Sequence, residues 1–172
     1  MTAKECEIRT AVFRVSGCAR FLGNVRAIAA AHGTRIVCFN TDLMAGRAHA
    51  EAALARALRA VHSGTAISAS LEMEALLSAS GNRQCSVAER FGIREGENRA
   101  YVCLCPPVES AFGDLAGIVE FVDEDWETIS EEKAGRLREA FGITSAELAA
   151  AGGADRLREL ILERVALLEV YR

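Results

Sequence analysis

The stretch 68–96 constrains the fold most, because it reads as two helices joined by a short polar corner, Ser80–Gln84. Ser70 stands where its side chain can cap the first helix, and glutamates follow in the first turn, where the helix dipole favours acids. Gly81 can take the left-handed conformation that ends a helix, and Gly92 stops the second run. The sequence therefore predicts two helices that meet at a tight turn.

The corner is also a candidate anion site. Asn82 can cap the second helix, which is expected from Arg83 to Phe91. We expect free backbone N–H groups, a positive dipole end and the Arg83 guanidinium at one point, a combination that suits a phosphate. The alternative is an ordinary inter-helix turn whose arginine pairs with a carboxylate. The candidate residues of the corner are Ser80, Gly81, Asn82, Arg83 and Gln84.

A helix predicted at Arg47–Ser63 has two informative faces. Its core-facing stripe is predicted, at helical spacing, to consist of Ala50, Leu54, Ala57, Leu58 and Val61. The opposite face carries His49, Arg56 and Arg59 among alanines. Arginine suits bidentate contact with phosphate, and alanine lets a partner backbone come close. A solvated, alanine-rich helix surface is the alternative.

The rest of the chain predicts strands and further helices without a repeat or linker. Strands are expected at Ile8–Val15, Arg35–Asn40, Arg99–Cys105 and Gly117–Val122. Helices are expected at Cys18–Ala31, Thr128–Phe141, Thr144–Ala151 and Ala154–Tyr171. We therefore expect a single domain over residues 1–172, which is long enough to bury a sizeable core.

The last of these helices is apolar on more than one side. One stripe suits docking on the domain and contains Leu157, Leu160, Ile161, Val165 and Leu168. A second set, on the other sides, contains Leu162, Ala166, Leu167 and Val170. A helix that is hydrophobic nearly all round is buried on several faces. Either the domain wraps it, or another protein binds the second set.

Composition excludes several classes of function. The net charge of -4 and the isoelectric point near 5.5 argue against nucleic-acid binding through the overall field, so any such contact must be local. The sequence shows no phosphate-binding P-loop, serine elbow or metal-ligand spacing, and we expect no catalytic residue, metal or cofactor. No run is long enough to span a membrane. With polar residues at Met1–Glu7 and no signal peptide, the six cysteines are expected to be reduced, in a cytoplasmic protein.

Part of the sequence carries a specific resemblance. The matching residues are Asn40-x-Asp42-Leu43-x-x-Gly46-x-x-His49, then Ala53 to Ala60, then Ser68-x-Ser70-Leu71-Glu72-x-Glu74-x-Leu76-Leu77, then Ala79-Ser80-Gly81-Asn82-Arg83-Gln84-x-x-x-Ala88-x-x-x-Phe91-Gly92-Ile93. This pattern resembles the Cgi-type subunit of the KEOPS complex, which in animals is called the PRPK-binding protein. The match is specific over Asn40–Tyr101 and compatible in length and element order elsewhere.

The resemblance implies an α+β domain, in which several helices pack on a small, mostly antiparallel sheet of about four strands. It implies a non-enzymatic subunit that binds and activates the small Bud-type atypical kinase/ATPase subunit through its N-lobe. It also implies recruitment of tRNA by its 3′ CCA end, for the threonylcarbamoyladenosine (t6A) modification that KEOPS makes. The rest of the complex would be an indirect partner.

We expect the corner residues and the face of His49, Arg56 and Arg59 to flank the CCA end, and the second apolar set of the last helix to bind the kinase. Two other classes stay open at this point. One is a protein or enzyme that binds a small phosphate-bearing metabolite at the corner. The other is a scaffold that binds proteins only.

Overall fold

The computed structural model describes residues 5–170, which group into two compact units. The first contains residues 5–40 and 92–124, and the second contains residues 41–91 and 125–170. Met1–Lys4, within the polar start of the chain, and Tyr171, the expected end of the last helix, lie outside the described residues. The expectation of one domain over the whole chain stays a prediction.

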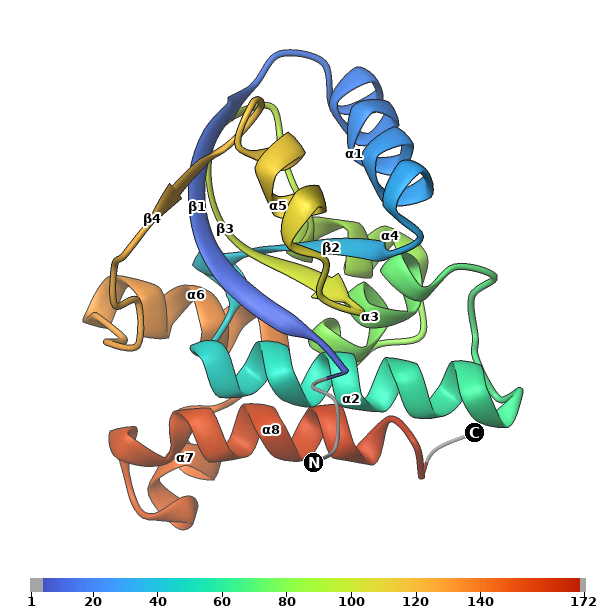
Figure 1. Ribbon diagram of the computed structural model, residues 1–172. Coiled ribbons are helices and arrows are strands. Elements are labelled where there is room, and N and C mark those ends of the chain that lie inside the picture. The colour runs from blue at the N-terminus through green and yellow to red at the C-terminus, as the bar shows by residue number, and fades with distance from the viewer. Residues whose placement is uncertain (1–4, 171–172) are drawn as a thin grey trace. The chain divides into compact units, whose positions relative to one another are not determined.

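The first unit is a four-stranded antiparallel sheet with helices on one face (Figure 1). Its elements are β1 (Glu7–Val15), α1 (Cys18–His32), β2 (Arg35–Asn40), β3 (Gly96–Cys105), α5 (Glu109–Leu115) and β4 (Glu120–Val122). The strand order is β2-β3-β1-β4, and Ala11 stands opposite Ala100 in the register of the central pair. The expected α+β fold with about four strands is confirmed.

Alternation along the strands builds the core of this unit, since every second side chain points to the same face of a sheet. Ala11, Phe13 and Val15 of β1 lie on that face and are buried. Strands β2 and β3 add Ile36, Ala100, Val102 and Leu104, and the helices add Phe21, Val25, Ala29, Ala111, Phe112 and Leu115. The helix α5 is missing from the sequence-based prediction. The backbone amides of residues 117–119 donate to carbonyl oxygens at the end of α5, so these residues form a turn. The last strand therefore starts at Glu120 and not at Gly117.

The second unit is helical. Its elements are a 3-10 turn η1 (Thr41–Leu43), α2 (Arg47–Ser63), α3 (Leu71–Ser80), α4 (Cys85–Ala88), η2 (Glu89–Phe91), α6 (Glu131–Phe141), α7 (Ser145–Ala151), η3 (Ala154–Arg156) and α8 (Leu157–Leu167). Helix α2 packs against α3 and α8, and Figure 1 shows α2 and α8 side by side. The predicted bounds of α2 are confirmed, and all five residues of the docking stripe of α8 are buried.

Local capping explains where the helices of the second unit begin and end. The Ser70 hydroxyl accepts a hydrogen bond from the Met73 amide, as expected for the start of α3. The Thr144 hydroxyl accepts from the Glu147 amide and starts α7. Gly81, with φ of 60°, ends α3 in the left-handed conformation that glycine adopts without strain.

One expectation about the cysteines is wrong. Cys6 and Cys105 form a disulfide and are not reduced thiols. Glu7 stands opposite Leu104 in the antiparallel β1–β3 pair, so the next residues along this register, Cys6 and Cys105, face each other with 4.3 Å between their Cα atoms. Sequence reasoning missed the bond because it did not know which strands are neighbours.

The remaining four cysteines are free thiols that differ in exposure, so their reactivity can be measured. Cys18, Cys38, Cys85 and Cys103 are free, and of these Cys85 is exposed. Burial raises the pKa of the Cys38 thiol to about 12, which makes it unreactive in the folded protein. We expect a thiol reagent to modify Cys85 first, to titrate four thiols after denaturation without reductant, and to titrate six after reduction. Six thiols before reduction would contradict the disulfide.

Candidate functional site

The candidate site is built around a buried ion pair between α2 and α3. Arg56 Nη1 lies 3.1 Å from Glu74 Oε1 and 2.9 Å from the hydroxyl oxygen of Ser78. The side chain of Arg56 is 5% exposed and that of Glu74 is fully buried. Arg56 therefore points from α2 into the interface with α3, and its charge is neutralised inside the protein.

Glu74 also organises the segment that leads into α3. Its second carboxylate oxygen accepts hydrogen bonds from the backbone amides of Ile67 at 2.9 Å and Ser68 at 2.8 Å. The Ser78 hydroxyl donates in turn to the Glu74 carbonyl oxygen at 2.8 Å. One carboxylate thus connects α2, α3 and the loop between them, which is why the buried charge is tolerated.

His49 is the second buried polar residue of α2. Its Nδ1 accepts from the Ala45 amide at 3.0 Å, and its Nε2 donates to the Ala79 carbonyl oxygen at 2.8 Å. An imidazole that accepts at one nitrogen and donates at the other is neutral. Burial lowers the pKa of His49 to about 4, and the nearby Lys133 charge acts in the same direction.

The exposed basic face predicted for α2 is therefore wrong for two of its three residues. His49 and Arg56 are buried and bonded to protein groups, because α3 packs against the part of the predicted basic face that carries them. Arg59 is the member that reaches solvent: its side chain is 62% exposed, and Nη2 donates to Glu169 Oε1 at 2.9 Å. Within the predicted core stripe, Leu58 and Val61 are only partly buried.

The corner Ser80–Gln84 has its predicted turn but not its predicted free amides. The Gly81 amide donates to the Ser78 carbonyl oxygen, and the Asn82 amide donates to the Ser80 hydroxyl. The Gln84 amide donates to the Asn82 side-chain oxygen at 2.9 Å. The expectation of free N–H groups is thus wrong for these three positions.

The second helix of this stretch is also shorter than expected. It begins at Cys85 and not at Arg83, because the Asn82 side chain closes a turn on Gln84 before the helix starts. Helix α4 ends at Ala88, and the 3-10 turn η2 carries the chain to Phe91.

The corner packs tightly on α8. A Cβ atom at Gly81 would lie 3.3 Å from the Arg164 carbonyl oxygen. Arg164 is itself fixed, since Nη2 lies 2.9 and 3.0 Å from the two carboxylate oxygens of Glu147 and Nε lies 3.0 Å from the Phe141 carbonyl oxygen. Glycine at position 81 is therefore favoured by its left-handed backbone conformation, and a larger residue there would press on the backbone of α8.

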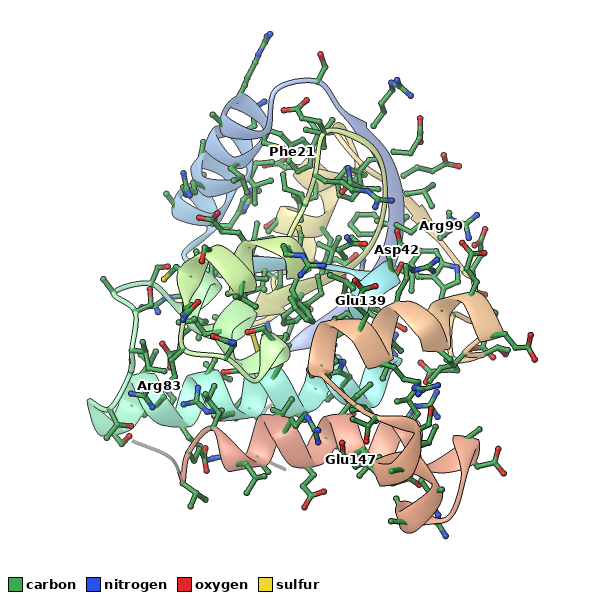
Figure 2. All side chains as sticks on the ribbon, turned by 180° about the vertical axis from the view of Figure 1, so that it is seen from behind. Phe21, Asp42, Arg83, Arg99, Glu139 and Glu147 are labelled. Atoms are coloured by element: carbon green, nitrogen blue, oxygen red, sulfur yellow. A yellow bond between two sulfur atoms is a disulfide. The ribbon has the colours of Figure 1, made fainter. Side chains whose placement is uncertain are left out.

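A groove of about 840 Å³ is lined by three of the four predicted basic residues, Arg56, Arg59 and Arg83, and not by His49. It is lined by Arg56, Arg59, Ala60, His62, Ser63, Gly64, Thr65, Ile67, Arg83, Leu168 and Glu169. Arg83 is exposed, and Figure 2 shows it beside the C-terminal part of α2. A second cavity of about 600 Å³ is lined by Gly81, Asn82, Arg83, Gln84, Arg164, Leu167 and Leu168. Arg83 and Leu168 line both cavities, and we call the surface of these two cavities the basic groove.

The apolar residues assigned to a partner lie on the outer side of α8. Leu162 and Leu167 are partly exposed, Ala166 is exposed, and Val170, just past the helix, is 69% exposed. The docking stripe fills the opposite side of the helix, so the burial of α8 is one-sided. We call Leu162, Ala166, Leu167 and Val170 the outer apolar row.

A third polar cluster lies in the first unit. His32 Nε2 is 2.6 Å from Asp114 Oδ2, and His32 Nδ1 is 3.0 Å from the Ser110 hydroxyl oxygen. Ser110 and Asp114 are one turn apart on α5, so the imidazole joins the end of α1 to one face of α5. Neither cavity described above contains these residues, and we assign them a structural role.

Two kinds of site are absent from the described part of the chain. Among residues 5–170, no group of three or more histidine, cysteine or acidic side chains is arranged to hold a metal ion. Within the same range, no helix combines the length and the apolar character that crossing a membrane requires.

Comparison with known proteins identifies the family. The model of the family described as kinase binding protein CGI-121 matches residues 23–169. The chain belongs to the CGI-121 family. This confirms the resemblance seen in the sequence, and it extends the match well beyond Asn40–Tyr101. The family description supports kinase binding as the function of the chain. A search of curated proteins found no match.

The buried histidine of this CGI-121 chain gives a pH-dependent stability. The unfolded chain binds a proton at His49 near pH 6.5, whereas the folded protein does so only near pH 4. Folding is therefore destabilised as the pH falls from 6.5 toward 4, by about 2–3 kcal/mol between pH 7.5 and pH 4.5. Urea unfolding of the wild type and of His49→Gln at both pH values measures this difference, which the variant should lack.

His62→Gln is the matched control, because His62 is exposed on the same helix. Its pH profile should run parallel to that of the wild type. Equal pH slopes for the wild type and His49→Gln would show that His49 is not the titrating group.

Proposed function

We propose that the chain is the non-catalytic KEOPS subunit that binds and activates the Bud-type atypical kinase/ATPase subunit and recruits tRNA through its 3′ CCA end for t6A formation. Membership of the CGI-121 family supports the kinase part of this proposal. The observation that carries the tRNA part is the basic groove, where arginines from two separate stretches of the chain, Arg59 and Arg83, line the same space.

The groove has the properties that a single-stranded RNA end requires. Such ends are bound through a few phosphate contacts and a surface that accepts unstacked bases. Arg59 and Arg83 supply guanidinium groups, and Ser63 and Thr65, whose hydroxyl oxygens are 2.8 Å apart, line the same groove. A local site of this kind is compatible with an acidic protein, because only a few phosphates need to be neutralised.

The structure changes the roles that we propose for the predicted RNA-binding residues. The phosphate contacts fall to the guanidiniums of Arg59 and Arg83, and no longer to the corner amides. Asn82 and Gln84 line the second cavity and offer side-chain amides to base edges. The residues that we propose to position this surface without touching RNA are His49, Arg56, Ser80 and Gly81.

The outer apolar row is our proposed kinase-binding surface. Interface cores are depleted in charged residues, and the row contributes four uncharged side chains to the side of α8 that the domain leaves at least partly exposed. It adjoins the basic groove, because Leu167 lines the second cavity and Leu168 lines both cavities. We further propose that the two units act as one domain and that the subunit needs no cofactor. We also propose that it works in the cytoplasm. The Cys6–Cys105 disulfide is compatible with this location in organisms whose intracellular proteins carry disulfides.

The RNA-binding role predicts a specific effect of Arg83. We expect Arg83→Ala to weaken binding of intact tRNA by about 10- to 100-fold, because a charge-assisted hydrogen bond to phosphate is lost. Filter binding or fluorescence anisotropy with intact tRNA, and with tRNA lacking its CCA end, measures this. The wild type should lose affinity when CCA is removed, and the variant should lose little more.

Arg90→Ala is the matched control, since Arg90 is exposed nearby and lines neither cavity. Wild-type binding that ignores CCA removal would refute the tRNA role and favour a phosphate-bearing metabolite as the ligand of the groove.

The kinase-binding role predicts an effect of charge on the outer apolar row. Ala166→Glu, at an exposed position, should abolish pull-down of the KEOPS kinase subunit while leaving the melting temperature nearly unchanged. Leu162→Glu and Leu167→Glu should act in the same direction. Ala150→Glu, on the exposed surface of α7, places the same charge elsewhere and should bind normally. Normal binding by Ala166→Glu would place the interface on another surface.

A further inference from the structure

We propose that Glu169 is a built-in competitor for the ligand of the basic groove: its carboxylate occupies Arg59, and an incoming phosphate must displace it. This inference rests on the proposed function, since it concerns regulation of the same site. It assigns to the C-terminal turn a role in setting the affinity of the groove.

Glu169 lines the basic groove and forms an ion pair with Arg59. Arg59 Nη2 donates to Glu169 Oε1 at 2.9 Å, and both residues line the same groove as Arg83. Among the described residues that line this groove, Glu169 is the one acid. The carboxylate therefore stands where the guanidinium of Arg59 would otherwise meet a phosphate oxygen.

The Glu169 carboxylate and a ligand phosphate compete for the guanidinium of Arg59. Carboxylate and phosphate oxygens accept the same forked hydrogen bonds from a guanidinium, so Arg59 cannot serve both fully at once. The side chains of Arg59 and Glu169 are 62% and 43% exposed, and solvent-exposed ion pairs are weak. A phosphate in the groove can contact the guanidiniums of both Arg59 and Arg83. The Glu169 carboxylate is seen paired with Arg59.

The Arg59–Glu169 pair is exposed to solvent, whereas the Arg56–Glu74 pair is buried. The carboxylate of Glu74 is fully buried, is bonded to Arg56, and also accepts from two backbone amides. A ligand in the groove cannot remove it without opening the α2–α3 interface. The Glu74 carboxylate is thus structural, and the Glu169 carboxylate is displaceable.

The turn that carries Glu169 connects this pair to the outer apolar row. The Glu169 amide donates to the Ala166 carbonyl oxygen at 3.3 Å, and the Val170 amide donates to the Leu167 carbonyl oxygen at 3.0 Å. Residues on both sides of Glu169 therefore belong to the row. A protein that packs on the row contacts the same turn that holds the competing carboxylate.

Glu169→Gln tests the inference, because it removes the charge and keeps the size of the side chain. Glu163→Gln is the matched control: Glu163 is exposed on α8, lines neither cavity, and gives the same change in net charge. Two probes are titrated by calorimetry or fluorescence anisotropy, namely inorganic pyrophosphate and a CCA-ended RNA minihelix. Melting temperatures confirm that both variants fold.

We expect Glu169→Gln to tighten binding by about 2- to 5-fold beyond any effect of Glu163→Gln, and raised salt to shrink this difference. Equal affinities of the two variants for every probe that binds would overturn the competitor role while leaving RNA binding intact. Tighter pyrophosphate binding by Glu169→Gln without any RNA binding would retain the competitor and refute the tRNA role. Absence of binding by both probes would overturn both.

Discussion

The buried ion pair between Arg56 and Glu74 is the interaction on which the second unit depends. Removing two charges from water costs several kcal/mol per ion, and their attraction offsets this only when further hydrogen bonds satisfy the remaining atoms. Here Ser78 and the amides of Ile67 and Ser68 supply such bonds, whereas the buried Arg56 Nε has no hydrogen-bond partner among the described residues. The pair fixes the rotation of α2 against α3 and the path of the loop between them. It thereby decides where the corner at Gly81 meets α8.

The positive charge of the basic groove depends on the burial of the Arg56–Glu74 pair. Once Arg56 is neutralised by Glu74, the outward cations of the groove are Arg59 and Arg83, from elements that the ion pair holds in place. An acidic chain can therefore carry a local positive region without a favourable overall field. The proximity of this region to the outer apolar row gives α8 a part in both proposed binding surfaces.

Much of this structure could be predicted from the sequence, because its local signals were strong. The capping serine at Ser70, the glycine at Gly81 and the apolar stripe of α8 depend on neighbouring residues only, and each was confirmed. Membership of the CGI-121 family was equally visible, since its motif is contiguous. Arg59 and Arg83 were chosen as candidates and do line one groove, although the sequence could not place them there.

The errors have a common physical cause, which is that the sequence does not say which elements are neighbours. The alanines of the predicted basic face, Ala48, Ala52 and Ala55, were expected to let a partner come close, but Ala48 and Ala55 are exposed. The protein's own α3 packs instead where Ala53 and Ala57 are fully buried. His49 and Arg56 were consequently assigned to solvent. The free amides of the corner were lost to the short-range hydrogen bonds of Ser80 and Asn82, which compete with any ligand.

The link between Cys6 and Cys105 has a topological consequence. The first unit is made of two segments that the intervening residues 41–91 separate in the chain, and the sulfur bridge joins those segments directly. A protease cut anywhere within 41–91 would therefore leave the sheet held by a covalent connection, and its halves would separate only in a reducing gel. The described cysteine of the second unit, Cys85, is free, so the two segments of that unit are joined covalently only through the backbone of the first.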